Sequence, residues 1–132
     1  MVSINVVAAA WKNGERMNPG EIASLISKTP IVQSNEIAVQ EKISELLSHH
    51  GVIHKREVVL GPGDRPDFML EGGIAIEVKL KAGKRAIYRQ CARYCEHEAV
   101  KGLILVSATA MGFPEGIHGK PTWVASLGGG WL

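Results

Sequence analysis

The sequence has no long hydrophobic run, and the longest apolar stretch in its 132 residues is far too short to cross a bilayer. A short apolar segment occupies residues 6–10, but no basic segment precedes it, so we expect no secretory signal. The chain is therefore predicted to be cytoplasmic and to have no membrane partner.

Cysteine is scarce, and the two cysteines, Cys91 and Cys95, lie four positions apart in a helical pattern. This spacing puts both thiols on one face of a helix and does not favour a disulfide between them, so we expect buried thiols. A zinc site that also uses His97 is the alternative, but the sequence shows no second pair of ligands. Zinc-protease spacing is absent among the histidines, and Ser107 has no nucleophile-elbow context.

Glycine-rich phosphate-binding motifs are missing as well. The glycine-rich stretches at 61–63 and 128–130 do not connect a strand to a helix, which is where dinucleotide and P-loop fingerprints place their glycines. We therefore expect no nucleotide cofactor.

Neither sign of charge dominates, since the formal net charge is +2, a balance common among soluble proteins. Between residues 79 and 101, however, positive side chains outnumber acids by five. They are Lys79, Lys81, Lys84, Arg85, Arg89, Arg93 and Lys101, against Glu96 and Glu98. Such a cluster is either a solvated helix face or a set of phosphate contacts.

The length fits one domain, and 45% hydrophobic residues indicate an ordered globular chain. Local signals predict helices over residues 19–29, 35–50 and 84–100. Strands are predicted at 4–11, 52–60, 66–70, 74–80, 102–108 and 122–127. We divide the single domain into an N-terminal extension with a short helix (1–34), a core (35–108) and a C-terminal strand and tail (109–132).

The order of these elements predicts an α/β fold. Residues 52–60, 66–70 and 74–80 should form three antiparallel strands. The helix that follows should return the chain by a right-handed crossover, so that 102–108 pairs in parallel with 74–80. The expected architecture is a central mixed β-sheet flanked by helices.

The most informative segment is 65–79, in which Asp67 is followed ten residues later by Glu77, and Glu77 by Lys79. Apolar residues alternate along 74–80, so Glu77 and Lys79 should project from the same face of a strand. Asp67 lies across the turn at 71–73. Two carboxylates and an ammonium placed together can hold a divalent cation and polarise a water against a phosphodiester.

A further carboxylate, Glu36, lies in the first turn of the helix predicted over 35–50, on the same face as Val39 and Ile43, whereas Glu41 and Glu45 point to the other side. One interpretation is that Glu36 only serves the first turn, where the helix dipole favours acids. The other is that Glu36 reaches the site of Asp67 and Glu77, and we favour this second interpretation.

The residues Pro66-Asp67…Glu77-Val78-Lys79 resemble the signature of the PD-(D/E)XK nuclease superfamily in its Glu-X-Lys form. The helical acid upstream, the hairpin and the downstream helix with Gln90 strengthen a resemblance that covers roughly residues 35–108. It implies a restriction-endonuclease-like core.

The resemblance also implies a mechanism. Asp67, Glu77 and the backbone carbonyl of Val78 would bind Mg²⁺ or Mn²⁺, and Lys79 would orient the attacking water. Glu36 and Gln90 would complete the catalytic set, with the Gln90 amide holding Lys79 or a phosphate. DNA contacts would come from Lys81, Lys84, Arg85, Arg89 and Arg93, with Tyr94 beside Arg93 and with Tyr88 and Ile87 in packing roles.

The leading hypothesis is thus a small metal-dependent deoxyribonuclease, similar to standalone phage enzymes, the VRR-NUC group and Holliday-junction resolvases. A phage protein would act in the host cytoplasm, and such compact cores usually act as homodimers. The alternatives are a resolvase of branched DNA, a catalytically inactive DNA-binding module of the same fold, and an α/β interaction protein. Two features depart from the family pattern: Arg65 stands where a small residue is common, and the helical acid is either Glu36 or Glu41.

Overall fold

The computed structural model describes residues 10–12, 15–108 and 112–127. Its elements, in chain order, are β1 (Ala10–Lys12), β2 (Glu15–Met17), α2 (Pro19–Lys28), α3 (Glu36–His49), β3 (His54–Arg56), β4 (Phe68–Leu70), β5 (Ile74–Lys79), α4 (Lys84–Cys95), β6 (Gly102–Ser107), β7 (Gly116–Ile117) and β8 (Lys120–Ser126). None of the described helices is both long and apolar enough to cross a membrane.

Six strands form one mixed sheet in the order β3-β4-β5-β6-β8-β7. Strands β3, β4 and β5 pair antiparallel, whereas β5, β6 and β8 pair parallel. The predicted antiparallel set and the predicted parallel pairing of 102–108 with 74–80 are therefore confirmed. Strands β1 and β2 form a separate hairpin.

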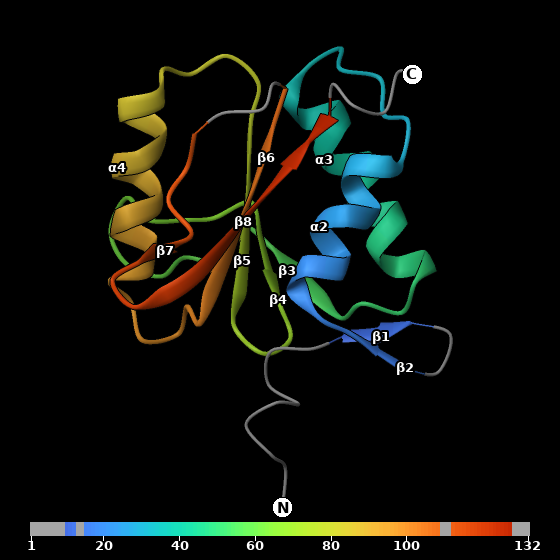
Figure 1. The fold of residues 1–132 in the computed structure, drawn as a ribbon, viewed down its shortest axis with the longest axis horizontal. Coiled ribbons are helices and arrows are strands. Elements are labelled where there is room, and N and C mark those ends of the chain that lie inside the picture. The colour runs from blue at the N-terminus through green and yellow to red at the C-terminus, as the bar shows by residue number, and fades with distance from the viewer. Residues whose placement is uncertain (1–9, 13–14, 109–111, 128–132) are drawn as a thin grey trace, which may run out of the picture.

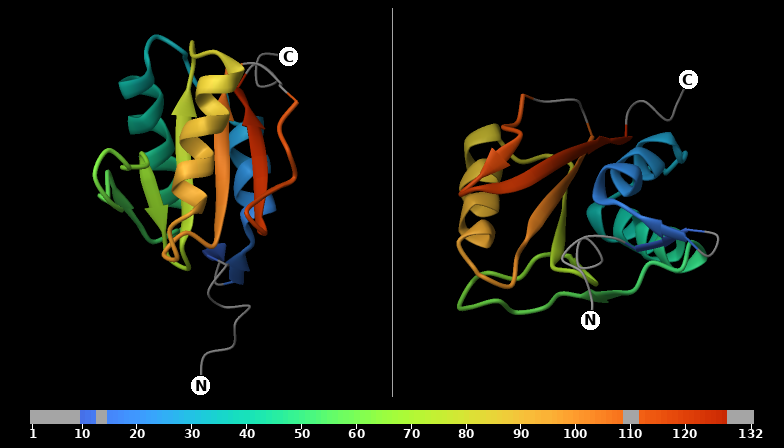
Figure 2. Two further views of the ribbon diagram at one scale, coloured as in Figure 1. Left: turned by 90° about the vertical axis from the view of Figure 1, so that its left-hand side faces the viewer. Right: turned by 60° about the horizontal axis from the view of Figure 1, so that its bottom comes forward.

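Helices cover both faces of this sheet, as Figure 1 shows: α4 lies on one side, and α2 and α3 lie on the other. Figure 2 (left) shows α4 in front of the sheet, with α2 and α3 behind it. The α/β prediction with a mixed sheet flanked by helices is confirmed at this level.

Alternate residues of β5 face the two layers, as the period of a strand requires. Ile74, Ile76 and Val78 are buried in the core cluster that α2 and α3 share with the sheet. Ala75 is buried in the second cluster, together with residues of α4 such as Cys91. Residues of β5 at an even number of positions from Ala75 therefore lie on the face of the sheet that α4 covers.

Two helices begin where the sequence predicts. The Asn18 side chain accepts a hydrogen bond from the Glu21 amide, and Glu21 in turn accepts one from the Asn18 amide, so the two form a capping box at the start of α2. The Asn35 side chain accepts a hydrogen bond from the Ala38 amide at the start of α3. This cap positions Glu36 as the first residue of α3.

Other boundaries differ from the predictions. Helix α4 ends at Cys95 rather than near residue 100, because His97 is held in a turn by Asp64 and by Lys120. Of the strand predicted over 52–60, only β3 forms. Glu57 ends it, because this residue takes a positive φ of 54° and its amide donates a hydrogen bond to the Asp67 carbonyl.

Strands β2 and β7 were not predicted. Of the strand predicted at 4–11, residues 4–9 lie outside the described part of the chain.

Both cysteines are buried on α4 and carry free thiols. The prediction of buried thiols without a disulfide between them is confirmed.

Gly73 in the β4–β5 turn has φ +84°, and a Cβ there would lie 2.6 Å from the Ala99 carbonyl oxygen. We predict that Gly73→Ala lowers the free energy of unfolding by about 2–4 kcal/mol, because it adds a backbone clash to the strain of a positive φ. Gly63→Ala is the matched control, since Gly63 has φ +78° and open space around it. Urea unfolding should show a loss of about 1–2 kcal/mol for the control, and equal losses would contradict the clash.

Candidate active site

The β4–β5 register brings the two predicted carboxylates together. Phe68 pairs with Ile76, so Asp67, one residue earlier, lies opposite Glu77. The Val78 amide donates a hydrogen bond of 2.7 Å to Asp67 Oδ2, and the Asp67 amide donates one of 3.2 Å to Glu77 Oε1. Each acid is thus held by the backbone of the other strand.

Lys79 lies beside Glu77, as the alternation predicts. Its Nζ is 3.2 Å from Glu77 Oε2. The Glu77 side chain is only 4% exposed, whereas that of Lys79 is 21% exposed. The ammonium group therefore lies between the buried carboxylate and the surface.

Glu36 reaches this region from the start of α3. Its Oε2 accepts a hydrogen bond of 3.0 Å from the Leu80 amide, immediately after β5. Glu41, the alternative acid, instead pairs with Arg56 at 2.6 Å. Of the two candidates, Glu36 is the one that the structure places beside the Asp67–Glu77–Lys79 strand pair.

Gln90 is connected to the site through a buried tyrosine. Its Nε2 donates a hydrogen bond of 2.8 Å to Tyr94 Oη, and the Tyr94 hydroxyl donates one of 3.2 Å to Glu77 Oε1. The Gln90 amide is thus bonded to Tyr94 in a relay to Glu77, and its expected contact with Lys79 or a phosphate stays a prediction. The expected contact of Tyr94 with DNA is wrong, because Tyr94 is fully buried.

The sequence does contain a signal for Tyr94. It lies on the same helical stripe as Ile87 and Cys91, and four residues after Gln90. A tyrosine within a buried stripe needs a partner for its hydroxyl, and the only carboxylates predicted on the adjacent strands were Asp67 and Glu77.

Burial sets the electrostatics of the site. Burial, together with the neighbouring Asp67 charge, raises the pKa of Glu77 to about 7, although Lys79 acts in the opposite direction. Burial also raises the pKa of Asp67, against the Val78 amide and Lys79, and the charges of Glu36 and Glu57 add to the rise. Two adjacent carboxylates are therefore held where their negative charges are poorly compensated.

Glu57 is a carboxylate that sequence reasoning missed. It lies in the left-handed region, its amide donates to the Asp67 carbonyl at 3.1 Å, and its side chain is 3.7 Å from Arg65. Nothing in the sequence indicates this conformation, because glutamate rarely adopts a positive φ.

The donor set fits a hard divalent cation. Carboxylate and carbonyl oxygens are the ligands that Mg²⁺ and Mn²⁺ prefer, and Asp67, Glu77 and the carbonyl of Val78 are the oxygen donors predicted here. A cation would also relieve the repulsion that raises both carboxylate pKa values. Within the described residues, no group of three or more His, Cys, Asp or Glu side chains gathers as a metal site. Water and substrate oxygens would have to supply the remaining ligands.

Two surface hollows flank the strand pair. One, of about 290 Å³, is lined by residues that include Asp64, Arg65, Gln90 and Tyr94. The other, of about 470 Å³, is lined by residues that include Glu36, Leu80 and Lys81. Asp67, Glu77 and Lys79 line neither hollow. The hollows are connected to the strand pair through Tyr94, which donates to Glu77, and through Glu36, which accepts from the Leu80 amide.

The five predicted DNA contacts differ in their surroundings. Lys81, Lys84, Arg85 and Arg89 are exposed. Arg93 is also exposed, but its Nε donates a hydrogen bond of 3.0 Å to Asp64. Hydrogen bonds from His97 and Arg93 hold the pKa of Asp64 below its usual range. Arg93 therefore braces α4 against the loop before β4, and a phosphate would have to compete with Asp64 for it.

The raised pKa of Glu77 makes stability depend on pH. The folded chain binds this proton more tightly than the unfolded chain, whose Glu has a pKa near 4.5, so the free energy of unfolding falls as pH rises from about 4.5 to about 7. We predict that Glu77→Gln is about 1–3 kcal/mol more stable than wild type at pH 8, with the difference shrinking toward pH 4.5. Urea unfolding across this range measures it.

The control for this prediction is Glu98→Gln at an exposed position, which should leave the pH profile unchanged. A constant difference between Glu77→Gln and wild type at every pH would contradict the assignment.

No protein-family model, curated protein or solved structure matches this chain.

Proposed function

We propose that this protein is a metal-dependent nuclease that hydrolyses DNA phosphodiester bonds at the Asp67–Glu77–Lys79 site. The observation that carries the proposal is the cross-bonded pair of buried carboxylates with an ammonium 3.2 Å from one of them. This arrangement supports the resemblance to the PD-(D/E)XK superfamily, and the mixed sheet is compatible with its restriction-endonuclease-like core.

The residues of the site have different roles, which follow from their positions. Asp67, Glu77 and the Val78 carbonyl would hold Mg²⁺ or Mn²⁺, which when bound supplies charge to polarise the phosphate and acidify a water. Lys79, whose side chain is 21% exposed against 4% for that of Glu77, orients that water and offsets the negative charge that grows on the phosphorus.

Other residues keep Glu77 in place. The Tyr94 hydroxyl and the Asp67 amide both donate to Oε1, so Oε2 is the oxygen left toward Lys79. Gln90 orients the Tyr94 hydroxyl by donating to it. Gln90 and Tyr94 are thus positioning residues, and Glu36 plays a similar part for the segment after Lys79 through the Leu80 amide.

Cleavage is the first test. Labelled single-stranded, duplex, flap and four-way-junction DNA should be cut in Mg²⁺ or Mn²⁺ and not in EDTA. We predict that Glu77→Ala and Lys79→Ala each lower the rate at least about 100-fold, because each removes a group that acts on the reacting atoms. Lys55→Ala, at an exposed position of β3, is the control for loss of a positive charge and should cut normally.

The substrate that is cut also tests the finer hypotheses. Preference for the four-way junction would favour a resolvase. Binding without cutting in every metal would contradict the nuclease and favour a DNA-binding module.

Metal binding gives a readout that does not depend on cleavage. We predict that Mn²⁺ binding, followed by water-proton relaxation, is abolished by Asp67→Ala and retained by Glu41→Ala. Since Glu77 must lose its proton to act as a ligand and its pKa is about 7, affinity should rise up to about tenfold per pH unit below 7 and level off above it. Equal binding at pH 5.5 and pH 8 would contradict Glu77 as a ligand.

A further inference from the structure

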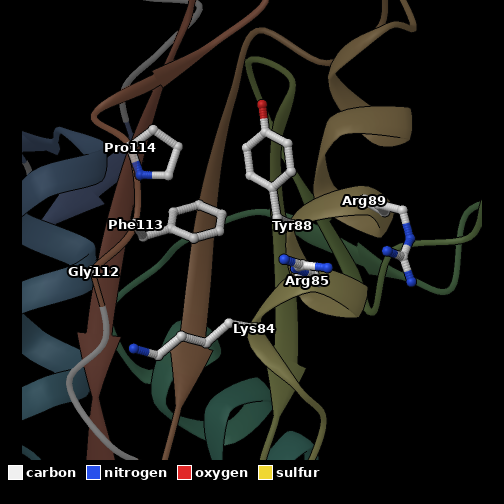
Figure 3. A pocket seen from close by; sticks show the side chains of 7 residues that line it. All are labelled: Lys84, Arg85, Tyr88, Arg89, Gly112, Phe113 and Pro114. Carbon is white, nitrogen blue, oxygen red and sulfur yellow. The ribbon is translucent and has the colours of Figure 1, made fainter.

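A second feature of α4 does not involve Asp67, Glu77 or Lys79. It is a surface pocket of about 330 Å³ between the first half of α4 and residues 112–114. Figure 3 shows Tyr88 next to Phe113, with Lys84 and Arg85 toward one end and Arg89 on the other side of Tyr88. Its volume lies within the range of pockets that hold small ligands or parts of larger ones.

The charges of this pocket favour an anion. Lys84, Arg85 and Arg89 line it, and no acidic residue does. Within the part of the chain that the structure describes, none of these three cations forms an ion pair with a carboxylate. Three unpaired cations at helical spacing form a surface that is complementary to successive phosphates.

The aromatic residues add a flat apolar surface. The rings of Tyr88 and Phe113 meet edge to face, with centroids 6.4 Å apart and planes at 65°. Phe113 also packs against the core cluster beneath α4, whereas Tyr88 is 43% exposed. The packing role predicted for Tyr88 is met by this contact with Phe113, which leaves much of the tyrosine ring exposed. An exposed tyrosine held at its edge by a fixed phenylalanine offers a ring face on which a planar group can stack.

A nucleic acid strand offers both planar bases, which can stack on aromatic rings, and phosphates, which can pair with cations. The aromatic rings of this pocket favour a single strand over a duplex. In a duplex, neighbouring pairs cover the faces of each base, so a side chain cannot stack on them without unstacking the helix. In a single strand the faces are free, and aromatic side chains beside a basic groove are the usual way in which proteins bind it.

The pocket and the hydrogen bonds that lead to the catalytic strand pair lie on the same helix. At about 100° per residue, Tyr88 and Gln90 lie about 200° apart around α4, so the pocket and the relay to Glu77 are on opposite flanks of one helix. Arg85, Arg89 and Arg93 are spaced by four along the exposed side between these flanks. A strand that stacks at Tyr88 can cross the helix over these arginines toward the site.

We propose that this pocket binds a single-stranded DNA segment, with one base stacked on Tyr88 against Phe113 and its neighbouring phosphates at Lys84, Arg85 and Arg89. The inference rests on the proposed function, because it names the substrate class of that nuclease: DNA with a single-stranded arm or end rather than plain duplex.

The test is a binding measurement in EDTA, where no cutting occurs. Fluorescence anisotropy of a labelled 15-nucleotide thymidine strand compares wild type, Tyr88→Ala and Tyr88→Phe. We expect about a tenfold loss of affinity for Tyr88→Ala and little change for Tyr88→Phe, which keeps the ring. A strand with abasic positions in place of bases should bind wild type about as weakly as the normal strand binds Tyr88→Ala.

Separate controls test the contribution of charge and the integrity of the fold. Arg89→Ala should weaken binding and lower the slope of log affinity against log salt by about one, whereas Lys55→Ala, on β3, should change neither. Because Tyr88 is 43% exposed and meets Phe113 edge to face at the surface, Tyr88→Ala should still be folded at the temperature of the binding assay, and a thermal unfolding curve checks this, which separates loss of stacking from loss of fold.

Failure of this inference can be told apart from failure of the nuclease. Cleavage that depends on Glu77, together with unchanged binding by Tyr88→Ala, overturns the pocket and leaves the nuclease. Stacking-dependent binding without metal-dependent cleavage supports the pocket and overturns the nuclease. Equal losses for single strand and for a 15-base-pair duplex in Tyr88→Ala would overturn the preference for single strands.

Discussion

The antiparallel register of β4 and β5 is the constraint on which the site depends. Pairing Phe68 with Ile76 leaves Asp67 opposite Glu77, and the two backbone-to-carboxylate hydrogen bonds then fix both acids. A shift by one residue would turn Glu77 and Lys79 to the α2 and α3 face, where the core is apolar. The hydrophobic alternation of β5 opposes that shift, so the same apolar residues that build the core also hold the carboxylates in place.

Burial makes this arrangement unfavourable by itself. Two carboxylates in a poorly solvated site repel each other, and Lys79 compensates only part of their charge. The rest of the structure supplies the stability that the site lacks: continuous apolar strands, two capped helices and hydrogen bonds to each carboxylate. Carboxylates whose pKa values are raised by burial and by each other occur more often at functional sites than elsewhere in proteins.

The sequence predicts the parts of this molecule that depend on local pattern. Asn18 and Asn35 are readable as caps, and the period of two in β5 puts Glu77 and Lys79 on one face. Features set by long-range contacts could not be predicted. Helix α4 ends at Cys95 without a glycine or proline, because His97 bonds to a loop more than thirty residues earlier. The relay through Tyr94 exists only because α4 packs over β5.

The buried thiols of α4 have a consequence for how the molecule can be observed. Burial raises the pKa of Cys91 to about 12 and also raises that of Cys95, so at neutral pH both are protonated and unreactive toward alkylating reagents. Alkylation must await separation of α4 from the sheet. The rate of thiol labelling therefore reports the rate at which α4, the helix that braces Glu77, separates from the sheet.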